Sequence, residues 1–301
     1  HGSQLYAVRL TPRGGRIVRV GELEAITASV RRVRADVEAA ALPSLGPMRA
    51  AVEGSLAAGL AAVDALVLAP LGPAERLVVV PSRALGGVPW GMLASRRGRP
   101  TLVARTATAW VAGTSLAPVR APRVLAIAGP DLQHADAEAA EVARIWGGQL
   151  VSSAQASLGS VVGALADQDL VHIAAHGRHH HQSPLFSTLR LADGPAFAHE
   201  LPDAGVTASH IVLSACEVGR ATVRAGDESL GLAAVLLSTG VRTVVAAASR
   251  IPDELAAETM TAYHRELAGG ADSALALARA GADLAPLARA FTCLGADWVA
   301  G

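Results

Sequence analysis

Two short stretches decide the fold: residues 172–177 read HIAAHG, and residues 211–219 read IVLSACEVG. Each contains a run of small and apolar residues, which is typical of a strand buried on both faces, and each run leads to one reactive side chain. The first stretch delivers His176 followed by Gly177, and the second delivers Cys216, 40 positions after His176. This spacing leaves room for a hairpin or helix and a return strand. A thiol and an imidazole at neighbouring strand ends are the groups that thiol-based acyl transfer needs.

The composition indicates one large globular unit or two closely packed halves. The chain has 301 residues and is 51% hydrophobic, which is ample for a sizeable core. Its formal net charge is zero, so we expect no nucleic-acid partner and no anionic membrane surface as a partner. All its basic side chains are Arg, and Lys is absent. Together with the abundance of Ala, Gly and Val, this usage is typical of a GC-rich bacterial genome.

The cysteine content points to a reducing compartment. Two cysteines, Cys216 and Cys293, are too few for a disulfide framework, so we predict a cytoplasmic protein. No signal peptide is visible, and we interpret residues 1–3 as a cloning remnant. The most apolar stretch, residues 50–70, is rich in Ala and is interrupted by two acidic side chains. We therefore expect a core helix there and no membrane span.

Strand-like and helix-like patterns alternate along the rest of the chain. We predict a hairpin over 5–20, helices over 22–42 and 47–68, a strand over 76–81, a strand pair over 101–113, a strand over 124–128, helices over 135–146 and 157–167, a hairpin around 189–194, a helix over 226–237, a strand over 243–248, and helices over 253–268 and 272–282. Glu138 and Glu141 are expected on the exposed face of their helix. This alternation favours a mostly parallel sheet sandwiched by helices, in which active groups lie at the carboxyl ends of strands.

Each reactive residue also has a structural interpretation. Cys216 could be an inert buried thiol, and His172, inside its strand, is better explained as a packed, hydrogen-bonded histidine. Asp227 and Glu228 open a helix, where capping competes with a role in a substrate cleft. The histidines at 176 and 179–181 suggest metal binding, but consecutive histidines do not share one face of a strand, so we predict no metal. Phosphate-loop and dinucleotide motifs are absent from the sequence, and we predict no cofactor.

The joint order of the motifs carries more information than any one of them. A strand ending in His-Gly is followed by a hairpin bearing Asp193, the strand ending in Ser-Ala-Cys, the segment 226–232 opening a helix, and a strand at 244–247. This order resembles the CHAT family of caspase-like peptidases. The segment 77–90 is similar to the amino-terminal half of that family, so the resemblance extends over about residues 5–280.

The resemblance implies an α/β fold with a caspase-like, mostly parallel sheet flanked by helices. It implies an amino-terminal scaffold half over residues 4–121 and a catalytic half over 122–301. It also implies a cysteine endopeptidase of the caspase–separase clan, with Cys216 as nucleophile and His176 as general base and later acid. The backbone N–H groups of Gly177 and Cys216 would form the oxyanion hole. A free thiol is only a few per cent thiolate at neutral pH, and a nearby imidazole raises that fraction.

The residues that relatives use to read the substrate side chain before the scissile bond, P1, correspond here to Ser214, Asp131 and Arg250. Ser214, two positions before Cys216, is uncharged. Asp131 would favour a basic P1 residue and Arg250 an acidic one, whereas an uncharged P1 follows if both face solvent. Of these three alternatives, we favour an uncharged P1 residue.

The resemblance further implies a setting. Such domains often follow sensor or helical-repeat regions, and bacterial members act in antiphage and cell-death systems, with gasdermin-like proteins among their substrates. We therefore expect a dedicated protein substrate and an activating sensor. Two other hypotheses stay open: a non-catalytic pseudo-peptidase that serves as an interaction module, and a metal-binding hydrolase.

Overall fold

The structure, a computed structural model, describes residues 1–178, 186–200, 205–214, 228–247 and 249–301. The described strands are β1 (Gln4–Thr11), β2 (Gly14–Glu22), β3 (Leu77–Val79), β4 (Thr101–Val103), β5 (Val124–Ala128), β6 (Gln149–Val151), β7 (Leu170–Ala174), β8 (Gly177–Arg178), β9 (Thr188–Leu191), β10 (Gly194–Phe197), β11 (His210–Ser214), β12 (Thr243–Ala247) and β13 (Phe291–Gly295). The described helices are α1 (Leu23–Ala40), α2 (Arg49–Val63), α3 (Ala107–Thr114), α4 (Ala135–Trp146), α5 (Leu158–Leu165), α7 (Glu228–Ser238), α8 (Asp253–Ala268) and α9 (Ser273–Ala280).

Eight of the strands form one sheet in the order β3-β4-β13-β12-β11-β7-β5-β6. The five from β12 to β6 run parallel to one another, and β13 pairs antiparallel with β12 and parallel with β4. Every residue of β5, β7, β11 and β12 is buried, which explains why these strands are apolar on both faces. The predicted mostly parallel sheet is confirmed.

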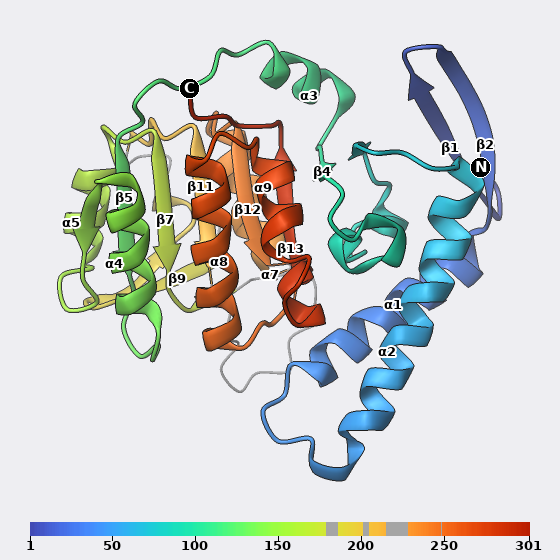
Figure 1. Ribbon diagram of the computed structural model, residues 1–301, viewed down its shortest axis with the longest axis horizontal. Coiled ribbons are helices and arrows are strands. Elements are labelled where there is room, and N and C mark those ends of the chain that lie inside the picture. The colour runs from blue at the N-terminus through green and yellow to red at the C-terminus, as the bar shows by residue number, and fades with distance from the viewer. Residues whose placement is uncertain (179–185, 201–204, 215–227, 248) are drawn as a thin grey trace.

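Helices cover both faces of this sheet. Figure 1 shows α4, α8 and α9 in front of the strands. The buried apolar residues form three clusters: one includes residues of α8 and α9, a smaller one includes residues of α4, and the third includes residues of α5 and α7. The carboxyl ends of β5, β7, β11 and β12 lie at a single edge, because these strands are parallel neighbours. Residues that follow those ends therefore meet at that edge.

The amino-terminal segment adds two hairpins. β1 and β2 pair antiparallel as predicted, and α1 packs antiparallel on α2 (Figure 1). β3 and β4 come from the predicted scaffold half but belong to the same sheet as the strands of the predicted catalytic half, since β4 pairs with β13. The boundary at residue 121 stays a prediction.

The helix that begins as α2 differs from the predicted core helix. The stretch Gly46–Leu71 has a mean hydropathy of 1.8 and is, by length and composition only, apolar enough to cross a membrane. Only 22% of its most apolar window is buried. One side packs on α1, where Gly59 faces Val33, and much of the remaining surface carries exposed alanines. The other elements do not enclose this helix.

Two further expectations need correction. The predicted strand pair over 101–113 is one short strand, β4, followed by the helix α3. The hydroxyl of Thr106 accepts a hydrogen bond from the backbone N–H of Ala109, which caps α3 at its start. The sequence pattern did not predict β6 or β13. Both strands are short, and the remainder of the sheet specifies their pairing.

Candidate active site

His176 lies two residues beyond the end of β7, at the carboxyl edge of the sheet. Its Nε2 is 3.1 Å from the backbone carbonyl oxygen of Asp131, which follows the neighbouring strand β5. A carbonyl oxygen only accepts, so Nε2 carries the proton and the neutral ring presents Nδ1 as its basic atom. This contact orients the imidazole from a second strand end.

Asp131 is held in an unusual backbone conformation. Its φ is +65°, in the left-handed region, which Asp tolerates better than most residues. Its carboxylate forms an ion pair with Arg190 at 2.5 Å, and the backbone N–H of Arg190 donates to the carbonyl of His176 at 2.8 Å. Asp131 and Arg190 therefore hold His176 from two sides. Both side chains of this ion pair are more than half exposed, and the choice among the three P1 alternatives stays a prediction.

A glycine allows this close arrangement of the two strand ends. The N–H of Gly129 donates to the carbonyl of Ala174 at 2.7 Å. A Cβ at residue 129 would lie 2.5 Å from the Cβ of Ala175 and 3.0 Å from the carbonyl oxygen of Arg190. Only glycine fits without a shift of backbone atoms.

The strand register relates His176 to the second reactive residue. β7 and β11 are adjacent and parallel; Leu170 pairs with His210 and Ala174 with Ser214, a constant offset of 40 residues. His176 and Cys216 have the same offset, and each follows the last register pair by two positions. Cys216 itself lies outside the described residues.

The other predicted site residues lie in different surroundings. Gly177 begins β8 and pairs with Leu189. Ser214 is 1% exposed, and its hydroxyl has no hydrogen-bond partner within the part of the chain that the structure describes. Arg250, three residues beyond β12, lines a large cavity, whereas Asp131 and Ser214 do not. The structure therefore brings His176 and Asp131 together and places Arg250 at a separate, neighbouring surface.

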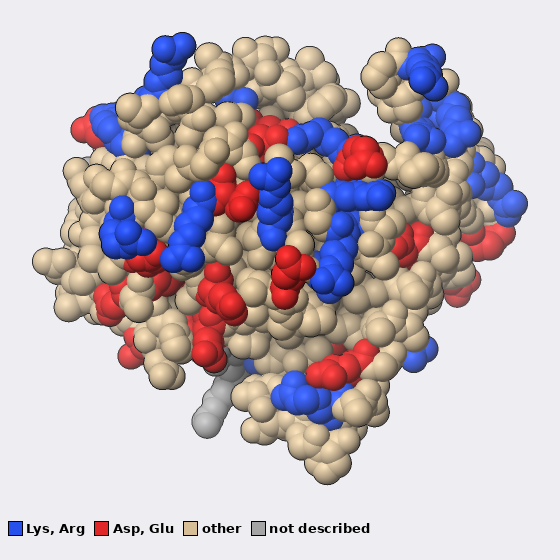
Figure 2. All heavy atoms as spheres, in the orientation of Figure 1, with Lys and Arg blue, Asp and Glu red and all other residues tan. Residues whose placement is uncertain are grey.

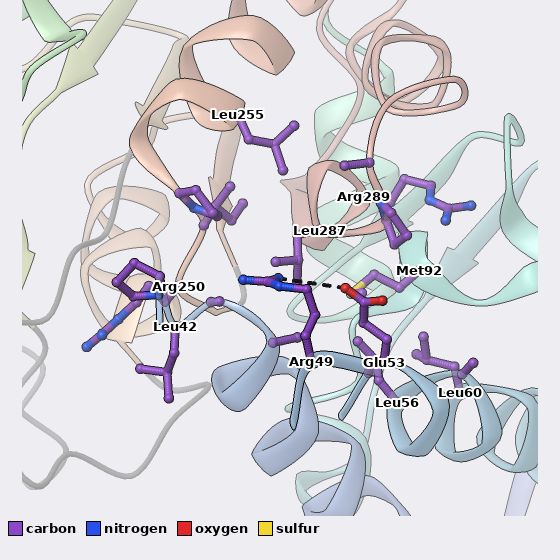
Figure 3. Close-up of a pocket in the computed structure, with 18 of the residues that line it drawn as sticks. Leu42, Arg49, Glu53, Leu56, Leu60, Met92, Arg250, Leu255, Leu287 and Arg289 are labelled. Atoms are coloured by element: carbon purple, nitrogen blue, oxygen red, sulfur yellow. Dashed lines mark ion pairs between the residues drawn. The ribbon is translucent and has the colours of Figure 1, made fainter. Parts of the chain in front are cut away.

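This cavity has a volume of about 970 Å³ and lies between the α1–α2 hairpin and the segments that face it (Figure 3). We call it the α2 groove. One wall consists of α1–α2 residues, and the opposite wall comes from three segments, around 92–97, 250–255 and 285–289. Leu132, the residue after Asp131, also lines it. The groove therefore opens beside the edge of the sheet that carries His176.

A chain of buried polar side chains lies beneath the sheet, against α4 and α8. The indole N–H of Trp146 donates to Nδ1 of His264 at 3.1 Å, and Nε2 of His264 donates to Nδ1 of His172 at 3.1 Å. Nε2 of His172 in turn lies 3.1 Å from Oε1 of Glu138, outside the angular range of a hydrogen bond, so we interpret this contact as a coulombic attraction. Trp146 can only donate, so the donors all point one way, toward the carboxylate.

This arrangement corrects the expectation that Glu138 is exposed, because its side chain is fully buried. It agrees with the prediction of a packed, hydrogen-bonded His172. A second buried histidine, His210, contacts the Tyr263 hydroxyl at 2.8 Å and the Thr243 carbonyl at 3.1 Å. Burial lowers the pKa of His210 to about 4, and burial together with His172 lowers the pKa of His264 well below its ordinary value.

The surface over α4, α8 and α9 carries interleaved charges of both signs (Figure 2). Glu141 there accepts hydrogen bonds from Arg144 and Arg265, which lower its pKa to about 2. Glu141 is only partly exposed, at 25% of its side chain, so the predicted fully exposed position needs correction: its two arginine partners cover much of it. The balanced face fits the zero net charge of the chain.

Some of the remaining predicted site residues lie outside the part of the chain that the structure describes. The histidines at 179–181, the segment 215–227 with Asp227, and residue 248 lie outside the described residues. Among those that the structure describes, no cluster of three His, Cys, Asp or Glu side chains could hold a metal ion. Cys293 is buried in β13, where burial raises its thiol pKa and where it contacts the Ser273 hydroxyl at 3.5 Å. It is a structural residue, as predicted.

Comparison with known proteins identifies the fold. The CHAT domain family model matches residues 57–299. The structure is similar to chains in two crystal structures of the Saccharomyces cerevisiae separase–securin complex, with TM-scores of 0.55 and 0.56 and 10% sequence identity. These matches cover 92% and 99% of this chain but 23% of each matched chain. A comparison with curated proteins gave no match.

Sequence reasoning missed the third component of the site because that component is a backbone atom. No side-chain pattern marks the Asp131 carbonyl as the partner of His176. The turn Gly129-Pro130-Asp131 after a buried strand was the available signal, since such residues favour tight or left-handed backbone. The α2 groove was missed because its walls come from segments about 200 residues apart.

Proposed function

Because this chain belongs to the CHAT domain family and has a caspase-like fold similar to that of separase, we propose that it is a cysteine endopeptidase. In this proposal Cys216 is the nucleophile and His176 the general base. The observation that carries the proposal is the contact between His176 Nε2 and the Asp131 carbonyl. A histidine with only a packing role would not need a backbone carbonyl to orient its imidazole at the end of a strand.

The geometry supports a different role for each of the two ring nitrogens of His176. Nε2–H donates to the Asp131 carbonyl, which leaves Nδ1 to take the Cys216 proton. The 40-residue offset between His176 and Cys216 equals the register offset between β7 and β11, which supports the two side chains following adjacent strand ends. When Nδ1 becomes protonated, the carbonyl dipole stabilises the resulting imidazolium.

The proposed reaction then proceeds in two steps. The thiolate of Cys216 attacks the scissile carbonyl carbon, and the C–N bond breaks as His176 Nδ1–H gives its proton to the departing amine. Water, deprotonated by Nδ1, hydrolyses the thioester and releases the carboxylate product and the free thiol. The backbone N–H groups of Gly177 and Cys216 are the proposed donors to the oxyanion.

We further propose the setting that the family resemblance implies. The peptidase acts in the bacterial cytoplasm within a defence or cell-death system, on a dedicated protein substrate of which gasdermin-like proteins are examples. A sensor or helical-repeat region activates it. The similar solved structures are of a separase–securin complex, which supports the proposal of a protein partner for this chain.

The direct test is cleavage of a diverse peptide library, read by mass spectrometry, by the protein and by two single-cysteine variants. Cys216→Ala is expected to abolish cleavage, whereas Cys293→Ala, at a buried structural thiol, retains the activity of its folded fraction. Cleavage that persists in Cys216→Ala would disprove the assigned nucleophile. The cleaved sites also decide among a basic, an acidic and an uncharged P1 residue.

The pseudo-peptidase hypothesis is tested by thiol reactivity. A Cys216 activated by His176 should react with iodoacetamide near neutral pH, and His176→Ala should slow that reaction. Burial raises the Cys293 pKa, so Cys293 should react only after unfolding. Equal and slow alkylation of both cysteines in the folded protein would favour the non-catalytic interaction module.

A further inference from the structure

We propose that the α2 groove binds an apolar segment of the protein substrate that carries acidic side chains, close to the bond that is cleaved. This inference rests on the proposed peptidase function. It assigns a binding role to a surface made jointly by the amino-terminal helices and the catalytic half.

The position of the groove links it to the catalytic edge. Leu132 lines the groove and directly follows Asp131, whose carbonyl contacts His176. Arg250 and Ile251 line it as well, three and four residues beyond the carboxyl end of β12. A polypeptide lying in the groove would therefore run past the strand ends at which His176 is placed.

The walls are suited to apolar side chains. Apolar residues from both sides of the groove face one another across it (Figure 3), among them Leu56, Leu60, Met92, Leu255 and Leu287. Binding pockets for small molecules have volumes of roughly 300–1,000 Å³, so about 970 Å³ lies at the upper end of that range. The size suits several residues of a peptide better than one side chain. Covering this surface would also bury part of the exposed apolar stretch of α2.

The charges that line the groove favour an acidic segment. Four arginines line it, Arg49, Arg97, Arg250 and Arg289, against two acids, Glu53 and Asp253. The ion pair between Arg49 and Glu53 at 3.7 Å is marked in Figure 3, and Asp253 accepts a hydrogen bond from the backbone N–H of His134 at 2.9 Å. Both acids are therefore engaged, and the lining residues carry a formal excess of two positive charges. Asp283, which is not among the lining residues, offsets part of this excess through an ion pair with Arg97 at 3.6 Å.

Arg289 gives a second reason to expect an acidic segment in the groove. Its Nε is buried with no hydrogen-bond partner among the described residues. Burial, and then the positive charge of Arg97, lowers the pKa of Arg289. A carboxylate entering the groove near Arg289 and Arg97 would relieve this repulsion and supply an acceptor for charged donors.

The test uses two adjacent alanines of α2 as a matched pair. Ala57 and Ala58 are both exposed on the same helix, but only Ala57 lines the groove. Glu is a good helix former, so Ala57→Glu and Ala58→Glu should fold equally well. Only the first variant places a negative charge and a longer side chain in the groove.

The first readout is binding, made in the Cys216→Ala background so that cleavage cannot interfere. The probes are three sets of synthetic labelled peptides: apolar with Asp and Glu, apolar with Arg, and apolar with Ser, measured by fluorescence anisotropy. We expect the acidic set to bind most tightly, Ala57→Glu to weaken it about tenfold or more, and Ala58→Glu to leave it within about twofold. Equal binding of the three sets, absence of binding, or equal effects of the two variants would overturn the proposal.

The second readout separates this inference from the peptidase proposal. With active protein, long library peptides that are cleaved should be enriched in apolar and acidic residues at a fixed distance from the cut site, and Ala57→Glu should remove that enrichment while short peptides are still cleaved. Absence of cleavage by any variant would count against the peptidase alone, because the binding measurement does not depend on catalysis. Sedimentation showing a dimer that Ala57→Glu dissociates and Ala58→Glu does not would assign the groove to a second copy and overturn the proposal.

Discussion

The carboxylate of Glu138 lies 3.1 Å from Nε2 of His172, and both side chains are fully buried beneath the sheet. Glu138 lies on α4 and His172 on β7, so the contact joins a covering helix to the strand that leads to His176. A buried carboxylate without a partner is costly, and the structure places the imidazole of His172 against this one.

We expect Glu138→Leu to lower the free energy of unfolding by about 1–3 kcal/mol, because the buried imidazole of His172 loses the coulombic attraction of the carboxylate that lies 3.1 Å away. Glu138→Gln keeps an oxygen at nearly the same place and should lose less. Chemical unfolding of the two variants measures the difference. A Leu variant as stable as the parent protein would show that the pair does not stabilise the fold.

Acid should destabilise the protein through its buried histidines. Burial lowers the pKa of His210 from 6.5 to about 4, so as the pH falls the unfolded chain takes up a proton before the folded chain does. The stability associated with neutral His210 is complete above about pH 6.5 and is lost progressively toward pH 4, by about 3 kcal/mol. His264, whose pKa is also lowered, acts in the same direction.

The measurement is the free energy of unfolding between pH 7 and pH 4 for the parent protein and for His210→Gln. We expect the variant to be less stable at pH 7, because it disturbs the contact with Tyr263, but to lose less stability on acidification. His199→Gln, at an exposed histidine, is the control and should keep the parent's pH dependence. An unchanged pH dependence in His210→Gln would contradict the prediction.

Variants at Asp131 distinguish the role of its backbone carbonyl from the role of its carboxylate. Asp131→Asn and Asp131→Gly tolerate the left-handed φ of +65°, and we expect both to keep kcat/KM within about threefold of the parent value. Asp131→Val is strained by about 1–2 kcal/mol or more in that conformation, so its carbonyl should shift away from His176 and lower kcat about tenfold.

Peptide cleavage by these three variants provides the measurement. If Asn and Gly lose as much activity as Val, the carboxylate and its ion pair with Arg190 are what matter, and the assigned role of the carbonyl is wrong. If the Asn variant instead changes the preferred P1 residue, Asp131 contributes to the substrate pocket despite its partner.

Gly129, two residues before Asp131, should be intolerant of any side chain. Gly129→Ala would place a Cβ 2.5 Å from that of Ala175 and 3.0 Å from the Arg190 carbonyl, so we expect a loss of about 1–3 kcal/mol in the free energy of unfolding. Gly159→Ala, at an open position on α5, should instead stabilise by roughly 0.5–1 kcal/mol. Thermal unfolding of both variants measures these changes in stability. Equal effects would show that the atoms around residue 129 shift easily to accommodate a Cβ.

Much of the fold could be predicted because several elements carry their own pattern. The predicted strand over 124–128 and helices over 135–146 and 253–268 have the bounds that the structure gives β5, α4 and α8. By contrast, the burial of Glu138 depends on His172, which lies 34 positions away on another element. The α4 pattern places a carboxylate at residue 138 but carries no information about which side chain lies opposite it.

The same limit explains what was missed at the site. The order of His176 and Cys216 was visible because strand ends have a sequence signature. The Asp131 carbonyl and the α2 groove arise from three-dimensional proximity between segments, and no local pattern encodes either. Strand β13 was overlooked because five residues between Ala-rich segments give too short a signal, although its neighbours specify its pairing.

Strand β13 follows the other strands of the sheet in sequence, yet it lies between β4 and β12. During synthesis, β3 and β4 emerge early and have no partner on that side until β13 has left the ribosome. The amino-terminal helices can join the catalytic strands across the sheet only at that late moment, and the α2 groove needs both. A nascent chain therefore completes this surface only after β13 has been translated, which delays assembly of the α2 groove until then.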